Sequence, residues 1–233
     1  MEIIAHIHTD FSTKFGIPRQ SGLVPEVKGK IIFTKDYRSR EAVRGLEEFS
    51  HLWLIWEFSA NQNRGKLTVR PPKLGGNTRM GVFATRSPFR PNPIGLSCVQ
   101  LEEIEFSTEY GPVLHVAGAD MMDGTPIYDI KPYLPYADAH PEAKAGFTEK
   151  ISPRISNLEV VIPQELEEKI PGEKRRALRK ILSQDPRPSY QQDENRVYGF
   201  GFAGFEIKFQ VVDQVVLVRD ILENENGLSL PPI

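Results

Sequence analysis

The stretch that decides the fold is Gly81-Val-Phe-Ala-Thr-Arg-Ser-Pro-Phe-Arg-Pro-Asn-Pro-Ile-Gly95. Residues 82–84 suit a buried strand, and residues 96–101 have the composition of the strand that follows. Between them stand three prolines, which cannot donate to a β-ladder and which restrict the residues before them. The sequence therefore predicts two strands joined by a stiff loop.

The rim of this loop carries Arg86, Arg90 and Asn92. Because prolines fix the backbone in advance, little entropy is lost when a ligand binds. Between Phe58 and Leu101 there is no Asp or Glu, although the whole chain has a formal net charge of −2. The cations of this acid-free stretch are Arg64, Lys66, Arg70, Lys73, Arg79, Arg86 and Arg90. We expect a local anion-binding face here, with a solvated positive loop as the alternative.

Composition is that of an ordinary globular protein, with 39% hydrophobic and 26% charged residues among 233. Cys98 is the only cysteine, which excludes an internal disulfide and a cysteine-based zinc site. It lies in an apolar run, so we expect a buried structural thiol rather than a nucleophile. No signal peptide and no membrane-spanning run is evident, and we expect a cytoplasmic protein.

Short apolar segments separated by turn signals, with little helix, predict a mainly β barrel or sandwich. The expected strands cover residues 2–8, 30–34, 51–58 and 113–119, and a short helix capped by Ser39 covers residues 39–44. Residues 120–136 are predicted to be a second functional loop. A small, polar, proline-containing segment at 137–147 predicts a boundary between a domain of residues 1–138 and one of residues 139–233.

The second domain is predicted to be smaller and α+β. Its expected strands are 158–162, 205–211 and 215–221, and its expected helices are 164–170 and 173–182. The second helix is basic through Lys174, Arg175, Arg176, Arg179 and Lys180. Such a helix is more often a solvated face than a binding face.

Several kinds of site are excluded by their missing motifs. His6 and His8 share one face of a strand, but no histidine pair has the spacing of a metal site on a helix, and we expect no metal. The chain also lacks a Gly-x-Ser-x-Gly elbow and both common phosphate-binding fingerprints. What remains is a set of loop arginines, one asparagine, an Asp-Gly-Thr turn and tyrosines. This set suits a ligand with an amino-acid end and a nucleoside end.

The loops resemble those of the TsaA-like family of tRNA adenine methyltransferases. The resembling residues are Pro18-Arg19-Gln20, Ala42-Val-Arg-Gly-Leu46, Phe49-Ser-His-Leu-Trp53, Val69-Arg-Pro-Pro72, Gly81 to Gly95, Asp123-Gly-Thr-Pro126, Asp129-Ile-Lys-Pro-Tyr-Leu-Pro135 and Gln184-Asp-Pro-Arg-Pro188. The resemblance implies a small β-barrel N-terminal domain that binds S-adenosylmethionine, and a homodimer. It implies methylation of the exocyclic amine of threonylcarbamoyladenosine, next to the anticodon of threonine tRNA.

The resemblance also implies which residues contact the cofactor. They are Pro18, Arg19, Gln20, Arg86, Leu96, Met122, Asp123, Gly124 and Thr125. After the aromatic strand, relatives often have His-Gln where this chain has Ser59-Ala60.

The amine that is to be methylated needs a side chain that accepts its hydrogen bond. An adenine exocyclic amine is a poor nucleophile and must be aimed at the methyl group, which orientation can achieve. Asn92, held between two prolines, has an amide oxygen that can accept from this amine; the alternative is that Asn92 only closes a turn. Asp129 and Tyr133 are the next catalytic candidates, and Tyr133 can also be a base-stacking or a core residue.

Two basic patches are available for tRNA. The acid-free stretch is expected to hold the anticodon arm, and the basic helix to grip the stem, with Arg187 and Tyr190 nearer the bases. A nucleotide or RNA sensor without turnover is the main alternative to an enzyme. A methyltransferase acting on a small molecule is a third possibility.

Overall fold

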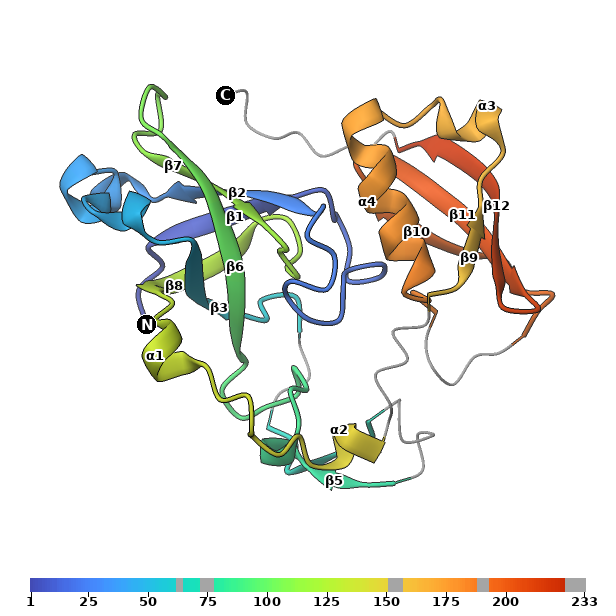
Figure 1. The fold of residues 1–233 in the computed structure, drawn as a ribbon, viewed down its shortest axis with the longest axis horizontal. Coiled ribbons are helices and arrows are strands. Elements are labelled where there is room, and N and C mark those ends of the chain that lie inside the picture. The colour runs from blue at the N-terminus through green and yellow to red at the C-terminus, as the bar shows by residue number, and fades with distance from the viewer. Residues whose placement is uncertain (62–64, 72–77, 151–156, 188–192, 225–233) are drawn as a thin grey trace.

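The computed structural model describes residues 1–61, 65–71, 78–150, 157–187 and 193–224 (Figure 1). Of the residues singled out above, those outside these ranges are Arg64, Pro72, Lys73, Pro188 and Tyr190. Within the described ranges, no helix combines the length and the apolar composition needed to cross a membrane.

The N-terminal half is a closed β-barrel with the strand order β1-β2-β7-β6-β3-β8. Its strands are β1 (Ala5–Thr9), β2 (Lys28–Phe33), β3 (His51–Glu57), β6 (Ile94–Glu105), β7 (Val113–Ala117) and β8 (Thr125–Pro132). A two-stranded ladder, β4 (Thr68–Val69) with β5 (Met80–Gly81), lies in the long connection between β3 and β6. The short helices α1 (Pro135–Asp138) and α2 (Phe147–Lys150) follow the barrel. The predicted mainly β barrel is thus confirmed.

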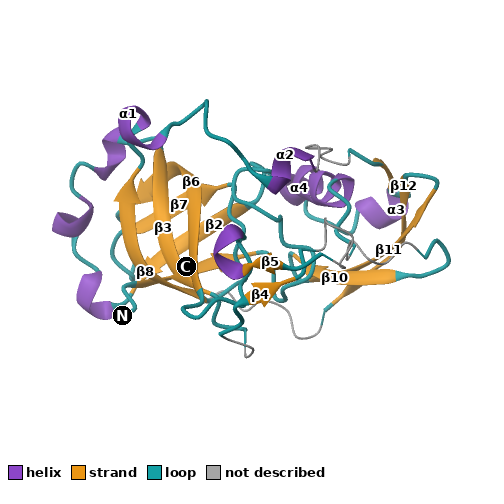
Figure 2. Ribbon diagram, turned by 90° about the horizontal axis from the view of Figure 1, so that it is seen from below, coloured by secondary structure: helices purple, strands orange, loops and turns teal. Residues whose placement is uncertain are grey.

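The C-terminal half is a sheet with the order β10-β11-β12-β9, in which β9 alone runs parallel to its neighbour. Its strands are β9 (Glu159–Val161), β10 (Tyr198–Phe202), β11 (Phe205–Val212) and β12 (Val215–Glu223). Two helices accompany the sheet, α3 (Gln164–Glu167) and α4 (Gly172–Ser183). Figure 2 shows the barrel and this second sheet at opposite ends of the molecule, with β4 and β5 between them.

Strand β3 shows how the sequence pattern produces the barrel. Its alternate residues Leu52, Leu54 and Trp56 are buried, and the residues between them face outward. The strand pairs with β6 on one side and β8 on the other, which makes it central, as its apolar run predicts. Trp56, the last buried residue of the strand, therefore lies at one mouth of the barrel.

Two predictions of local structure are wrong. Residues 82–84 form a turn of 3₁₀ helix rather than a strand, closed by a hydrogen bond from the Thr85 amide to the Val82 carbonyl. Only Val82 of this turn is buried, whereas Phe83 is 77% exposed and lies against the guanidinium of Arg90. The segment 120–136, expected to be a loop throughout, contains β8, because Ile127 and its neighbours fill the barrel and pair with β1 and β3.

The two halves share one continuous hydrophobic core. Phe11, which follows β1, packs against Phe202 of β10 with ring centroids 5.5 Å apart. The backbone amide of Ala203 donates to the carbonyl of Asp10. The boundary between residues 138 and 139 stays a prediction, because the loop after β1 belongs to both packing units.

Most cations of helix α4 are held within the molecule. The ion pairs are Lys174 with Asp10 at 2.6 Å, Arg176 with Glu26 at 2.8 Å and Arg179 with Glu167 at 2.6 Å. The guanidinium of Arg175 donates to the carbonyl of Ile170, which caps the preceding turn. Four of the five cations of this helix thus have partners within the molecule, and its expected grip on the tRNA stem stays a prediction.

Candidate cofactor-binding site

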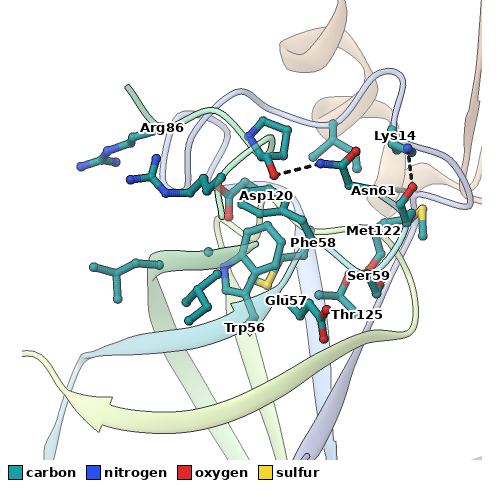
Figure 3. Close-up of a pocket in the computed structure, with 18 of the residues that line it drawn as sticks. Lys14, Trp56, Glu57, Phe58, Ser59, Asn61, Arg86, Asp120, Met122 and Thr125 are labelled. Atoms are coloured by element: carbon teal, nitrogen blue, oxygen red, sulfur yellow. Dashed lines mark hydrogen bonds between the residues drawn. The ribbon is translucent and has the colours of Figure 1, made fainter. Parts of the chain in front are cut away.

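A cavity of about 580 Å³ opens at the mouth of the barrel where β3 ends and β6 begins (Figure 3). Its wall comes from separate parts of the chain: the loop after β1, the end of β3 with the residues that follow, the proline-rich loop, and the turn before β8. A concave site at a barrel mouth, built from loops on a rigid sheet, is a common place for a ligand.

An aromatic pair lies inside the cavity. The rings of Trp56 and Phe58 have centroids 4.3 Å apart and are tilted by 60°. The Trp56 indole lies directly over Gly95, where an added Cβ would stand 2.2 Å from the ring. Glycine is therefore required at position 95 for the indole to keep this place.

The carboxylate of Asp120 is tied to the same indole through Ser97. The Trp56 indole N–H donates to the Ser97 hydroxyl oxygen at 3.0 Å, and that hydroxyl donates to Asp120 at 2.6 Å. Burial raises the pKa of the Asp120 carboxyl above its usual value, although hydrogen bonds from Ser97 and the backbone and the charge of Arg86 oppose this. Asp120 is an oriented, partly buried acid facing a ligand-sized cavity.

The wall opposite β3 contains the two predicted arginines. One guanidinium nitrogen of Arg86 donates to the side-chain oxygen of Gln20. Arg19 donates to the backbone carbonyls of Asp185 at 3.2 Å and Arg187 at 3.4 Å. Arg19 thus joins the cavity wall to the C-terminal half.

Other contacts hold the loops around the cavity, as Figure 3 shows for two of them. The Asn61 amide donates to the Pro88 carbonyl at 2.9 Å, and the Lys14 ammonium donates to the Ala60 carbonyl at 2.6 Å. Arg90 donates to the Thr85 carbonyl at 2.6 Å, so this arginine fixes the proline-rich loop from within.

Seven of the nine predicted cofactor residues line the cavity. They are Pro18, Arg19, Gln20, Arg86, Leu96, Met122 and Thr125. Asp123 and Gly124 are not in the lining and shape the turn instead. The Asp123 carboxylate accepts from the Thr9 amide and contacts the His8 ring, both at 3.1 Å, and the Gly124 amide donates to the Ile7 carbonyl.

The three predicted catalytic residues are not part of the described lining. Asn92 is exposed at the rim, between the lining residues Arg90 and Ile94. Asp129 forms an ion pair with Lys131 at 2.8 Å on the outside of β8. Tyr133 packs against His51 and Trp53, toward the end of β3 that lies away from Trp56.

Sequence reasoning missed several residues that line the cavity. These are Lys14, Trp56, Phe58, Asn61 and Asp120. The available signal for Asp120 was its position directly after the apolar run that ends at Ala119, where a strand leaves the core. Among the described residues, no three side chains of His, Cys, Asp or Glu gather as a metal site would require.

Two family models match this chain in succession. The tRNA-methyltransferase O N-terminal domain matches residues 6–139, and the TrmO C-terminal domain matches residues 155–224.

The chain belongs to the tRNA-methyltransferase O family.

Relatives support this membership over nearly the whole length. A tRNA (adenine(37)-N6)-methyltransferase of Escherichia coli is 41% identical over 221 residues, which cover 91% of this chain and 93% of that protein. A protein of the same name from Eikenella corrodens is 44% identical, covering 76% and 99% respectively. The crystal structure of TrmO from Pseudomonas aeruginosa superposes with a TM-score of 0.74 at 31% identity, covering 94% of this chain and 96% of that one.

In this member of the family, two acids line the cavity: Glu57 and Asp120. The Tyr128 hydroxyl donates to the Glu57 carboxylate, which sets the orientation of that acid at the end of β3. Ser59 and Ala60 also lie in the lining. The cavity thus combines an aromatic pair, two oriented carboxylates on the barrel side and three arginines, Arg19, Arg86 and Arg90, on the loop side.

Proposed function

We propose that this protein is an S-adenosylmethionine-dependent tRNA methyltransferase. Its proposed substrate is the exocyclic amine of threonylcarbamoyladenosine, next to the anticodon of threonine tRNA. Membership of the tRNA-methyltransferase O family supports the reaction class. The single structural observation that carries the proposal is the barrel-mouth cavity in which the Asp120 carboxylate lies beside the Trp56–Phe58 pair.

The residues of the cavity fit S-adenosylmethionine. A volume of about 580 Å³ is within the usual range for a site that buries a small ligand. Trp56 and Phe58 offer apolar faces to an adenine, and the carboxylates of Asp120 and Glu57 can hold cationic or hydroxyl groups. Arg19 and Arg86 can bind a carboxylate. When bound, the cofactor supplies a methyl group on a positively charged sulfur.

The chain's own contribution to the transfer is to orient the acceptor amine and accept its hydrogen bond. We propose Asn92 for this role, because it stands at the rim between two segments that line the cavity. Its side-chain oxygen can accept from the amine and aim the nitrogen lone pair toward the cavity. Asp129 and Tyr133 remain the next candidates, although both lie outside the described lining.

We also propose a homodimer. The outward positions of β3 and β6 next to the cavity carry Trp53, Ile55, Leu96 and Cys98, and Leu96 is 56% exposed. An apolar outer face on a barrel suits burial against a second copy. Because Leu96 also lines the cavity, such a partner would lie beside the ligand. Light scattering of the wild type and of Leu96→Asp tests this: a monomeric wild type would contradict the dimer.

The same proposal assigns different functions to the two parts of the chain. Residues 1–138 carry the cavity, and residues 139–233 contribute to tRNA binding in the cytoplasm, where tRNA is used. The competing hypothesis is a sensor that binds nucleotide or RNA without turnover.

The deciding experiment supplies labelled S-adenosylmethionine and bulk tRNA from cells that lack the activity. We expect label in tRNA, and its loss after ribonuclease treatment. Cofactor binding without any transfer would favour the sensor. Label that resists ribonuclease would indicate a small-molecule acceptor.

A further inference from the structure

A second cavity, of about 1180 Å³, shares a wall with the first. The residues that line both are Lys14, Arg19, Gln20, Thr85, Arg86, Pro88 and Phe89. Its own wall comes from residues 66–71 around β4, Arg79 before β5, and residues 147–148 of α2. Two ligands placed in the two cavities would therefore meet across Thr85, Arg86 and the Pro88–Phe89 segment.

The second cavity is electropositive. The charged side chains of its described lining are all cations: Lys14, Arg19, Lys66, Arg70, Arg79 and Arg86. The sequence has no Asp or Glu from Phe58 to Leu101, the stretch from which most of this lining comes. A concave surface with one sign of charge raises the local concentration of oppositely charged ligands.

Several of these cations already have partners inside the molecule. Lys14 donates to the Ala60 carbonyl, Arg19 to the Asp185 carbonyl and Arg86 to Gln20. The Lys66 ammonium lies 4.9 Å from the centre of the Phe89 ring. These contacts leave Arg70 and Arg79 as the side chains most available to a ligand.

Arg70 follows β4 and Arg79 precedes β5, so both arginines stand just beyond the same end of the β4–β5 ladder. The last pair of that ladder is Val69 with Met80, and the antiparallel register brings the two arginines close to each other beyond it. Like charges held close together repel each other. Neither arginine forms an ion pair with any residue that the structure describes. An anion bound between the two guanidiniums would relieve this repulsion.

We propose that the second cavity holds the acceptor nucleotide, with Arg70 and Arg79 binding an anionic group of that nucleotide. This inference rests on the proposed function, and it adds where the acceptor lies. Because the two cavities adjoin along these common residues, an acceptor amine at their junction would lie next to the ligand of the first cavity, as a direct transfer requires. The Phe89 ring provides a face on which the base can stack.

The anion has two possible sources on one RNA. It is a backbone phosphate beside the reacting base, or the carboxylate of the threonylcarbamoyl group on that base. Arginine binds both through two parallel N–H···O contacts. The two sources predict different effects of the arginine substitutions on the rate with modified and unmodified tRNA, and on the salt dependence of RNA affinity.

The test variant is the double substitution Arg70→Gln/Arg79→Gln, and the matched control is Lys35→Gln/Arg44→Gln. The control removes the same charge from exposed residues outside both cavities. We expect the test variant to lose at least about tenfold in kcat/KM for tRNA, as loss of a charge-assisted contact implies. Its S-adenosylmethionine affinity by calorimetry should equal that of the wild type, and the control should match the wild type throughout.

Two substrates separate the sources: tRNA carrying the threonylcarbamoyl group and the unmodified transcript. If the arginines bind the carboxylate, only the modified tRNA loses rate, and the preference for it disappears. If they bind a phosphate, both tRNAs lose rate equally, and the slope of log affinity against log salt falls by roughly 0.7 to 0.9 per contact.

Equilibrium binding of the same RNAs, followed by fluorescence anisotropy, decides the inference independently of turnover. Wild-type binding and kcat/KM in the test variant would overturn it. A wild-type protein that transfers no methyl group to either tRNA would overturn the proposed function. In that case, weaker RNA binding by the test variant than by the control would still support the cavity as an RNA site.

Discussion

The guanidinium of Arg19 donates a hydrogen bond of 3.2 Å to the backbone carbonyl of Asp185. Arg19 belongs to the wall shared by both cavities, whereas Asp185 follows the last helix of the C-terminal half. Asp185 has a left-handed backbone (φ 50°), and its carboxylate binds the Arg187 guanidinium at 2.8 and 2.9 Å. A small, strongly restrained turn in one half therefore positions a ligand-facing side chain of the other.

Removal of Arg19, or of the turn that holds it, should weaken ligand binding. We expect Arg19→Ala to lower S-adenosylmethionine affinity about tenfold, the usual effect of one charge-assisted hydrogen bond. Asp185→Gly keeps the left-handed backbone accessible but releases Arg187, and should lower the affinity by a smaller factor. Calorimetry measures both. Asp193→Gly, in an exposed turn of the same half, is the control, and equal affinities for it and Asp185→Gly would argue against positioning.

Asp120→Asn should stabilise the fold at neutral pH while weakening the cofactor complex. Burial raises the pKa of Asp120 above its ordinary value of 3.8, so ionisation of this carboxyl disfavours the folded state. The protonated Asp120 carboxyl contributes to the free energy of unfolding. This contribution is complete below pH 3.8 and disappears as pH rises through the folded-state pKa. The free energies of unfolding of variant and wild type should therefore converge at low pH and separate above it.

Chemical denaturation between about pH 3 and pH 8 measures this difference, and calorimetry measures cofactor affinity. In the Asp120→Asn variant the Ser97 hydroxyl can still donate to the new side-chain amide oxygen, so the local network is kept. A variant that is less stable than the wild type at neutral pH would show that the carboxylate is needed for folding.

Gly95→Ala should displace the Trp56 indole and damage the first cavity. The new Cβ would stand 2.2 Å from the ring, and overpacking of this kind costs about 1–3 kcal/mol of stability. Gly81→Ala, at the other end of the same loop, meets no atom within 4 Å and is the control. The tryptophan fluorescence and the cofactor affinity should change in Gly95→Ala and should stay at the wild-type values in Gly81→Ala. Unaltered cofactor affinity in Gly95→Ala would remove Trp56 from the site.

Asn92→Ala should slow methyl transfer at least about tenfold and leave cofactor affinity nearly unchanged, because the amide is proposed to act on the acceptor amine. Single-turnover rates with saturating tRNA separate this effect from RNA binding. Asp129→Asn serves for comparison, since Asp129 lies on the outside of β8. Wild-type rates in Asn92→Ala would mean that this residue only closes a turn.

Local patterns predicted the parts of the fold that local chemistry determines. The alternation in β3 and the cap at Ser39, whose side chain accepts from the Glu41 amide, are both present. The strand expected at residues 82–84 failed because the chain closes on itself there through the Thr85 amide. Strand order in the barrel could not be derived, since it depends on pairings between segments far apart in the sequence.

The same reason explains the mixed result at the cavity. The sequence favoured Asp123 over Asp120, and nothing in the local pattern separates two acids three residues apart. The structure separates them through distant partners: Asp123 is held by His8 and Thr9 of β1, while Asp120 reaches Ser97 of β6. These hydrogen-bond partners are more than twenty residues away in the chain, so a single sequence does not indicate them.

The packing of Gly16 against Phe200 has a consequence for synthesis on the ribosome. Gly16 has a left-handed backbone (φ 88°), and any Cβ there would stand 2.2 Å from the Phe200 ring, so the loop leading to Arg19 rests directly on β10. The barrel strands are complete at Pro132, but β10 begins only at Tyr198. We therefore expect the barrel segments of a nascent chain to be available well before that loop can be seated, and ligand-binding competence to arrive only after β10 has been synthesised.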